Sequence, residues 1–269
     1  MERKWRVRRM DSGDFTDAEA IHKLPPGVAL SWGIVRQQRR GPKGELSVKK
    51  IVDAAIEIAD RDGLAAVSMS RVAQSLGFTT MSLYRYITGK DDLLVLMQDA
   101  VSNIPIPPEE ADKPWRQEMA EYAWACIDVF RKHPWYGDMP ITSVPLTPGN
   151  LQVIDWMLRI MKPFPLTDFE KMSFLLLISS YARACGLIAR DMERVIREGG
   201  SREAFTGAGY GEALRQLVKP DRFPHLHPVL MSGAYTDEAE NPIGDDLDFG
   251  LERILDGIEH YMRQKTADK

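Results

Sequence analysis

The stretch SLGFTTMSLYRYITGKDDLL, residues 75–94, places hydroxyl residues, tyrosines, an arginine and a lysine between a glycine and an apolar run. Only Leu83 and Ile87, four positions apart, would face inward on a short helix here. The remaining side chains are of the kind that contact phosphates and base edges. By itself, this density of polar groups also fits a solvated helix of a helical bundle, so the neighbouring segments have to decide.

Two amphipathic helices are predicted in front of this stretch. Apolar residues of the first repeat at three- and four-residue steps, at Val48, Ile51, Val52, Ala55, Ile58 and Ala59. Ser47 can accept a hydrogen bond from a first-turn amide as its N-cap, and Gly63 can end it because glycine tolerates positive φ. Ser68 can cap the second helix, which Gly77 ends. Its apolar side consists of Met69, Val72, Ala73 and Leu76.

A tight turn at Gly77 and Phe78 then leads into a third short helix, which Thr79 or Thr80 would cap. Two helices joined by a glycine-containing turn, the second one polar, form the helix-turn-helix arrangement, whose second helix enters the DNA major groove. The side chains offered to base edges or phosphates are Thr80, Met81, Ser82 and Arg85. Those offered to the sugar-phosphate backbone are Tyr84, Tyr86 and Lys90.

The longer run KKIVDAAIEIADRDGLAAVSMSRVAQSLGFTTMSLYRYITGKDDLL, residues 49–94, resembles the DNA-binding domain of the TetR family of bacterial transcriptional repressors. The likeness rests on the I..AA..I....G pattern of the first helix, on VAQSLG in the second, and on LYRYITGKDDLL across the third and fourth. The resemblance implies that DNA meets Thr80, Met81, Ser82 and Tyr84. Lys90 takes the place of the family's phosphate-binding lysine, and Tyr86 that of a histidine or tyrosine. Met81 is bulkier than the family's usual small or proline residue and can contact a thymine methyl.

Residues 1–46 show no sustained period and contain the basic pieces RKWRVRR and RQQRRGPKG. We predict a segment that is mostly disordered or a DNA-contacting arm. In an arm, Arg36, Arg39, Arg40 and Lys43 would favour the negative potential of the minor groove. An unstructured solubilising tail is the alternative. The full set of candidate DNA-binding residues is Arg39, Arg40, Lys43, Ser68, Ser70, Thr79, Thr80, Met81, Ser82, Tyr84, Arg85, Tyr86 and Lys90.

Charge is divided unevenly along the 269 residues, whose formal net charge is −4. Residues 1–103 carry 16 Lys and Arg against 13 Asp and Glu, whereas residues 104–269 carry 19 against 26. A mildly basic front and an acidic rear fit a chain of which one part meets a polyanion. The sequence has no run of about 18 apolar residues and no secretory signal, so we expect a cytoplasmic protein without membrane contact. Cys126 and Cys185 are expected to be reduced thiols.

The rear of the chain shows helical periodicity. Helices are expected over residues 115–132, 149–162, 167–198 and 245–264. The glycine-rich or acidic segments at residues 198–214 and 232–246 are predicted to be loops. The sequence therefore predicts an all-α fold. Its parts are a disordered or DNA-contacting arm over residues 1–46, a three-helix helix-turn-helix domain over 47–103 and a ligand-binding and dimerisation domain over 104–265.

The segment FGLERILDGIE, residues 249–259, resembles the end of a C-terminal domain of the tetracycline-repressor type. This resemblance implies a homodimer, and a small-molecule site walled by the first three rear helices. The candidate ligand-binding residues are Tyr122, Cys126, Phe130, Trp135, Trp156, Phe174, Ile178 and Tyr181. Trp156 would stack on the ligand and Tyr181 would hydrogen-bond to it. Apolar stripes at helical spacing fit an ordinary core equally well.

Other chemistries have little support in the sequence. GxSxG and P-loop patterns are absent, so we expect no enzyme. His225 and His227 have no carboxylate or cysteine at ligand spacing, so we expect no metal site and no cofactor. The segment GDMPITSVPL, residues 137–146, lacks the histidine with which the family's founding members bind magnesium-chelated tetracycline. That ligand is therefore not expected here.

We expect a homodimeric repressor that binds double-stranded, palindromic operator DNA and is released by a small, largely apolar effector. The alternative is a helix-turn-helix regulator whose C-terminal domain binds a protein partner. The interior distinguishes the two. A ligand-responsive domain needs an apolar cavity of about 300–1,000 Å³, whereas an interaction module would be filled.

Overall fold

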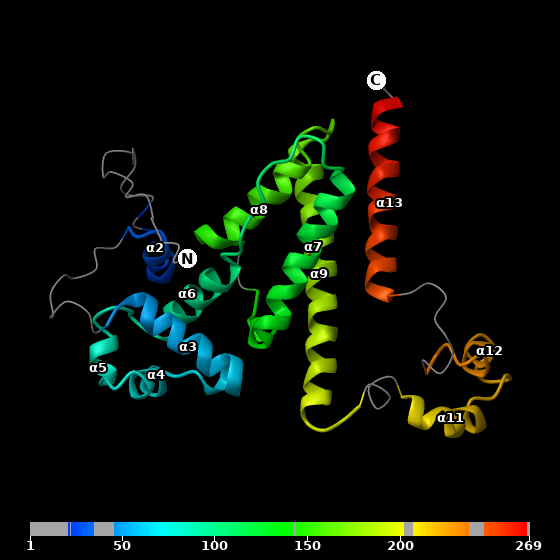
Figure 1. Ribbon diagram of the computed structural model, residues 1–269, viewed down its shortest axis with the longest axis horizontal. Coiled ribbons are helices and arrows are strands. Elements are labelled where there is room, and N and C mark those ends of the chain that lie inside the picture. Colours follow the sequence, from blue (N-terminus) through cyan, green and yellow to red (C-terminus); the bar gives the residue numbers. More distant parts are fainter. Residues whose placement is uncertain are drawn as a thin grey trace.

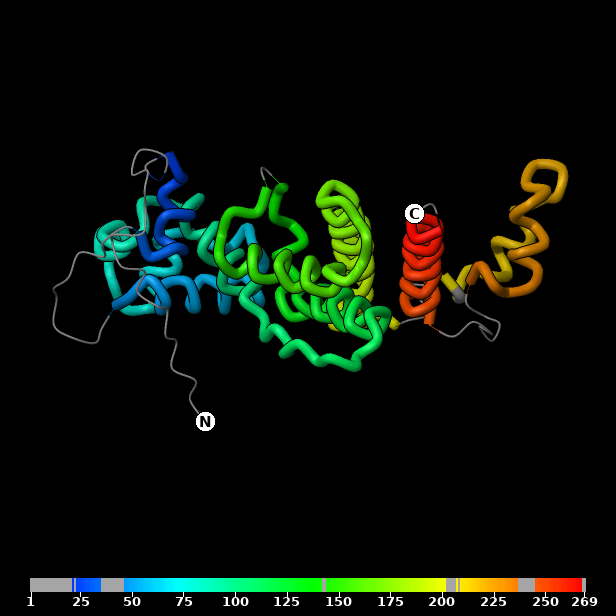
Figure 2. Tube along the Cα trace, turned by 90° about the horizontal axis from the view of Figure 1, so that it is seen from above, coloured from blue at the N-terminus to red at the C-terminus, as the bar shows by residue number. Residues whose placement is uncertain are grey.

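The structure, a computed structural model, describes residues 21, 23–34, 46–141, 144–201, 207–236 and 245–267. Helices and no strands occur within these ranges, which confirms the all-α prediction (Figure 1). The molecule is elongated. Residues 48–102 lie at one end, the helices of residues 115–197 lie in the middle, and residues 207–231 lie at the other end (Figure 2).

Five helices form the front of the molecule: α2 (Pro26–Ser31), α3 (Val48–Asp62), α4 (Met69–Ser75), α5 (Thr80–Leu83) and α6 (Lys90–Ser102). The predicted caps are present. The Ser47 side chain accepts from Lys50 N at 3.2 Å, and Ser68 and Thr79 cap α4 and α5 in the same way. Gly77 adopts a φ of 75° between α4 and α5, where a residue with a Cβ would be strained.

The core of this front part is closed. Leu83 and Ile87 are fully buried, as predicted, and pack with apolar residues of α3, α4 and α6. These two side chains are the means by which the short α5 is attached to the rest. Burying a leucine or isoleucine side chain contributes about 1.5–3 kcal/mol, which offsets the low intrinsic stability of a single helical turn.

Part of the N-terminal segment, residues 26–31, is helical within the stretch over residues 1–46 that was predicted to be mostly disordered or a DNA-contacting arm. Helix α2 packs on α6, and Gly27, Val28 and Ala29 are buried. The predicted arm residues Arg36, Arg39, Arg40 and Lys43 lie outside the described residues.

The rear helices follow the predicted bounds closely: α7 (Trp115–Lys132), α8 (Pro148–Ile160), α9 (Asp168–Arg197) and α13 (Asp246–Ala267). The short 3-10 helix η2 (Pro134–Asp138) follows α7. Helix α9 begins with a capping box in which Thr167 and Glu170 each accept from the other's backbone amide. Acidic residues at its start and basic residues at its end also complement the helix dipole.

Two short helices lie between α9 and α13, and the first of them overlaps the end of residues 198–214, which were predicted as a loop. Helices α11 (Gly211–Leu217) and α12 (Leu226–Met231) pack mainly on each other, away from the remaining helices (Figures 1 and 2). Exposed apolar side chains on or beside them are Tyr210, Leu217, Val229, Met231 and Tyr235. A pair of such short helices has too little apolar contact to form a core of its own.

Helix α9 is long and apolar enough to span a membrane by length and composition alone, and 28% of its most apolar window is buried. Its polar side chains tie it to the rest of the fold. Arg183 Nη2 donates to Gly137 O at 2.8 Å, and Arg190 Nη1 lies 2.7 Å from Asp138 Oδ1. These contacts fix α9 against η2.

Candidate DNA-binding surface and candidate effector cluster

The polar face of α5 is open to solvent at the front of the molecule. Met81 is 72% exposed, and Tyr84 and Arg85 are exposed beside it. Thr79 Oγ1 and Ser82 Oγ lie 2.9 Å apart, which holds both hydroxyl groups at the start of the helix. Because Leu83 is buried beneath, this face is presented outward on a fixed support. Its mixture of hydroxyl, aromatic, thioether and guanidinium groups matches what base edges and phosphates accept.

The remaining sequence-predicted DNA contacts flank α5. Ser68 and Ser70 lie at the start of α4 with their hydroxyl oxygens 3.2 Å apart. Lys90 is exposed at the first position of α6, where backbone amides also point outward. Tyr86 is half-buried and packs against the core, so only part of its ring is free to contact a backbone.

Helix α6 is joined to the rear of the molecule through the start of α8. Gly149 N donates to Asp99 Oδ1 at 2.7 Å. A Cβ atom on Gly149 would lie 2.5 Å from Asp99 O, so the close approach requires glycine. Burial raises the pKa of Asp99, and the bond from Gly149 acts in the opposite direction. Beside this contact, the buried Ser102 hydroxyl lies 3.3 Å from Asn150 Oδ1.

Trp135 lies elsewhere than in the predicted ligand site. Its side chain is 1% exposed and packs in the core of the front part. Its Nε1 donates to Asp60 Oδ1 on α3 at 2.6 Å, and His133 Nδ1 lies 2.9 Å from the same oxygen. The chain turns toward α3 after His133-Pro134, which moves Trp135 away from the inner face of α7. Trp135 therefore connects the front and the rear of the molecule.

Tyr122, Trp156 and Ile178 meet in one buried cluster between α7, α8 and α9. The Tyr122 and Trp156 rings pack edge to face with centroids 5.3 Å apart. The Tyr122 hydroxyl lies 3.4 Å from Ser179 Oγ, a partner that the sequence pattern did not indicate. Burial raises the pKa of the Tyr122 hydroxyl, so this group is a neutral hydrogen-bonding group inside an apolar cluster.

Three further predicted residues border this cluster. Cys126 and Phe174 pack against it, and burial raises the pKa of the Cys126 thiol to about 12. The Tyr181 hydroxyl donates to Leu247 O at 2.5 Å, at the start of α13. Phe130 lies apart, stacked on Tyr136 with ring centroids 5.1 Å apart.

Helix α13 also packs on this cluster. The sequence had predicted only α7, α8 and α9 as its walls. Its buried residues Leu251, Leu255, Ile258 and Met262 face the cluster. Arg116 on α7 holds α13 by ion pairs to Glu252, Asp256 and Glu259. The acidic spacing along α13 could have indicated a basic partner, although not which one.

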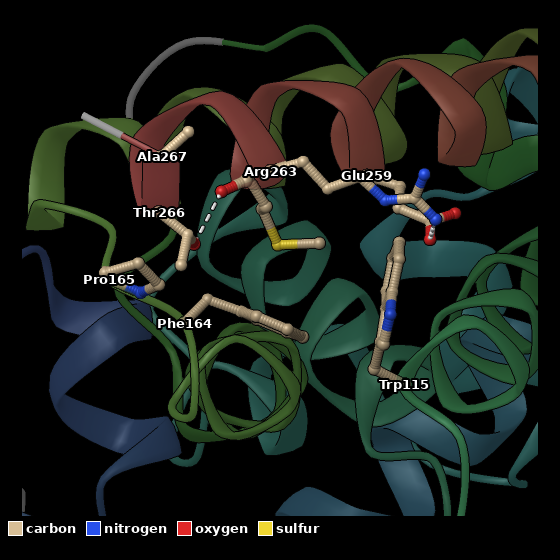
Figure 3. Close-up of a pocket in the computed structure, with 8 residues that line it drawn as sticks. Trp115, Phe164, Pro165, Glu259, Arg263, Thr266 and Ala267 are labelled. Atoms are coloured by element: carbon tan, nitrogen blue, oxygen red, sulfur yellow. Dashed lines mark hydrogen bonds and ion pairs between the residues drawn. The ribbon is translucent and has the colours of Figure 1, made fainter. Parts of the chain in front are cut away.

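A pocket of about 540 Å³ opens where α13 ends against the start of α7 (Figure 3). Trp115, Phe164, Pro165 and Met262 supply its apolar walls, and Glu259 and Arg263 lie at its side. Trp115 and Phe164 pack edge to face with centroids 5.6 Å apart. None of these residues was among the predicted ligand contacts. The pocket borders the Tyr122–Trp156 cluster, because Met262 and Trp115 also pack in that cluster.

The front and the rear of the chain each match a known protein-domain family. Residues 51–97 match "Bacterial regulatory proteins, tetR family", and residues 107–262 match "Tetracyclin repressor-like, C-terminal domain". The chain belongs to the tetR family, a family of helix-turn-helix transcriptional regulators and not a class of enzymes.

Individual relatives agree with this assignment. The chain is 35% identical to the HTH-type transcriptional repressor DrrR1 of Streptomyces coeruleorubidus, over 94% of this chain and 92% of that protein. It resembles the apo crystal structure of ActR from Streptomyces coelicolor with 26% identity and a TM-score of 0.62, covering 80% of this chain and 97% of that one. The complex of ActR with actinorhodin gives 25% identity and a TM-score of 0.67, covering 83% and 98%. The protein is thus a DNA-binding repressor of the tetR family.

Proposed function

We propose that this repressor is a cytoplasmic homodimer that places its two copies of α5 in successive major grooves of a palindromic operator. We assign residues 47–103 to DNA binding and residues 104–265 to effector binding and dimerisation. The exposed polar face of α5 over the buried Leu83 carries the proposal. Half-sites about one helical turn apart would match the two-fold axis of such a dimer.

Operator selection from random and genomic DNA tests the assignment of α5. Replacing Lys90 by Ala is expected to weaken binding to all sequences, because it removes a phosphate contact and its released counterion. Replacing Thr80 or Ser82 by Ala is expected to change the preferred bases instead. If both kinds of variant bind the selected operator like the wild type, the DNA-binding assignment is wrong.

The dimer is supported by the exposed apolar residues of α9. Phe169 is 89% exposed and Leu176 is 69% exposed, with Met172 between them. A contiguous apolar strip of this kind marks a protein contact. Helix α13 runs alongside α9 and carries Phe249, which is also exposed, so the two helices together offer a surface for a second copy.

The effector is proposed to be a small, largely apolar molecule. ActR, which is similar over most of its length, has been crystallised with actinorhodin. In the present chain the Tyr122–Trp156 cluster and the adjoining pocket of about 540 Å³ offer aromatic walls. We propose that the effector contacts Trp156 and Tyr181 and that the pocket at Trp115 is its access route.

Release requires that the effector bind a non-operator conformation more tightly, because equal affinity for both conformations shifts nothing. Trp156 lies on α8, and the start of α8 contacts α6 through Gly149 and Asp99. A displacement of α8 by the effector would therefore be passed to α6 and from there to α5. Effector binding would thereby change the distance between the two copies of α5 in the dimer.

Thermal-shift screening of metabolites and antibiotics is the experiment that identifies the effector. With a stabilising compound in hand, Trp156→Ala is expected to abolish its release of operator DNA. Tyr181→Phe, which keeps the ring, is expected to weaken the response. Trp115→Ala is the comparison variant, because it alters the access pocket at the border of the cluster and leaves the proposed effector contacts Trp156 and Tyr181 in place. Wild-type responses in Trp156→Ala and Tyr181→Phe would place the effector elsewhere, and the absence of any stabilising small molecule would favour a protein partner.

A further inference from the structure

Helix α2 lies outside the residues that match the family, yet it is attached to the DNA-binding part by a specific contact. It follows Pro25, which provides no capping side chain. Gly27 N instead donates to Asp92 Oδ1 at 2.6 Å, and Asp92 lies in the first turn of α6. A carboxylate 65 positions further along the chain thus does what an N-cap side chain does in most helices.

The contact is close enough to require glycine. A Cβ atom on Gly27 would lie 2.9 Å from both Asp92 Cα and Asp92 Oδ1. The Cα atom belongs to the backbone of α6 and cannot move aside as the end of a side chain could. The Pro-Pro-Gly sequence at residues 25–27 therefore suits this docking in two ways, since proline begins the helix and glycine permits the approach.

Asp92 also holds the residue in front of α6. The Thr88 hydroxyl donates to the other carboxylate oxygen of Asp92. The start of α6 has no side-chain cap of its own, because its N-cap is Gly89. The two oxygens of Asp92 therefore tie together α2, the turn before α6 and the first turn of α6.

The far end of α2 is attached as well. Trp32 Nε1 donates to Leu146 O at 2.8 Å, in the segment directly before α8. Helix α2 is consequently fixed at both ends, to α6 by Gly27 and to the approach to α8 by Trp32. A helix held in this way restrains the turn of α6 against which it packs.

We propose that Asp92 is a positioning residue, which together with α2 holds the first turn of α6 so that Lys90 meets an operator phosphate. Lys90 is exposed two positions before Asp92 in the same turn. A pre-ordered support reduces the entropy lost when a flexible lysine is fixed on a ligand. The inference rests on the proposed phosphate contact of Lys90.

A double-mutant cycle on operator binding tests the proposal. Asp92→Ala and Asp92→Asn remove the same charge, but only asparagine keeps a carbonyl oxygen for Gly27 N. Asp92→Ala is expected to weaken operator binding about tenfold relative to Asp92→Asn and to lower the salt-dependence slope by about 0.9, the value for one phosphate contact. In the Lys90→Ala background the two Asp92 variants are expected to bind alike, because both substitutions act through the same phosphate.

Gly27→Val provides a second approach that leaves Asp92 in place. Gly27→Val should lower the operator affinity and the salt-dependence slope as much as Asp92→Ala does. The dimer and the circular dichroism spectrum should be unchanged. Equal operator affinity for Asp92→Ala and Asp92→Asn would overturn the positioning role, as would a full additional loss in the Lys90→Ala background. If Lys90→Ala itself bound normally, the failure would lie in the proposed phosphate contact.

Discussion

The front and the rear of this molecule handle their apolar residues differently. In the front part, α3, α4 and α6 enclose Leu83 and Ile87 completely, and the exposed Met81 and Tyr84 belong to the face assigned to DNA. In the rear part, α9 leaves Phe169 and other apolar residues in solvent. The front core is closed within one chain, by its own helices together with Trp135 of η2, whereas the rear has surfaces that a second copy would cover.

This difference indicates how each part can tolerate change. Substitutions inside the front core should act on the stability of the single chain. Substitutions on α9 should act on assembly and leave the fold of the chain intact.

The largest effect is expected for Trp135→Ala. The side chain is 1% exposed, packs in the front core and donates to Asp60, so truncation should lower the free energy of unfolding by about 3–5 kcal/mol. Urea denaturation measures it. Trp115→Ala, at a half-buried tryptophan of the rear part, is the matched control and should cost clearly less. If both variants lost the same free energy of unfolding, the distinction between the front and the rear would be wrong.

Leu176→Glu should break assembly. A charge on the exposed strip of α9 would have to be buried against a second copy, and we expect the dimer dissociation constant to rise at least about 100-fold, or about 2.7 kcal/mol. Analytical ultracentrifugation gives the constant. Ile141→Glu, at a 79% exposed position outside α9, should leave it unchanged. A dimer that survives Leu176→Glu would place the subunit contact on another face.

The basic segment between α2 and α3 should have a moderate effect. Replacing Arg39, Arg40 and Lys43 together by Ala should weaken operator binding and lower the salt-dependence slope by about 0.9 for each lost phosphate contact. This triple variant leaves α2 intact, which deletion of residues 1–44 would not. An unchanged slope and affinity would mean that the segment is a solubilising tail.

The smallest effect is expected at Glu170, which joins the start of α9 to the end of α13. Hydrogen bonds from Lys265, Tyr261 and Thr167 lower the pKa of Glu170 from 4.5 to about 2. Because the folded pKa is depressed, this contribution to stability is present above pH 4.5 and is lost as the pH falls toward 2. Glu170→Gln should lower the melting temperature slightly at neutral pH, and the difference should narrow below pH 4.5. Glu109→Gln, at an exposed carboxylate, is the control and should show no such trend.

Local patterns were sufficient for the elements that depend on local chemistry. The spacing of apolar residues predicts that α7 is a helix, and His133-Pro134 predicts where it ends, because the residue before a proline disfavours the helical conformation. Ser47 and Thr79 cap their own helices within three residues, so their roles can be inferred from the neighbouring sequence. The polar face of α5 is predictable for the same reason.

Features that depend on distant partners were not predictable. The cap of α2 is Asp92, far along the chain, so the Pro-Pro-Gly sequence alone indicates only a turn. Trp135 turns away from α7 because Asp60 accepts its indole N–H, and no spacing within α7 shows this. The weak apolar pattern of residues 198–214 predicts a loop, although α11 begins at Gly211, because α11 and α12 have little core to bury.

The bond between Trp135 and Asp60 has a consequence for the length of the operator. On α9, Arg183 donates to a backbone carbonyl of η2 and Arg190 pairs with Asp138 of η2. Trp135, also in η2, donates to Asp60 near the end of α3. In a dimer built on α9, the angle at which the two copies cross would be transmitted along this chain of contacts to both recognition helices. The subunit contact would then set the number of base pairs between half-sites, whereas α5 would determine only which bases are recognised within each half-site.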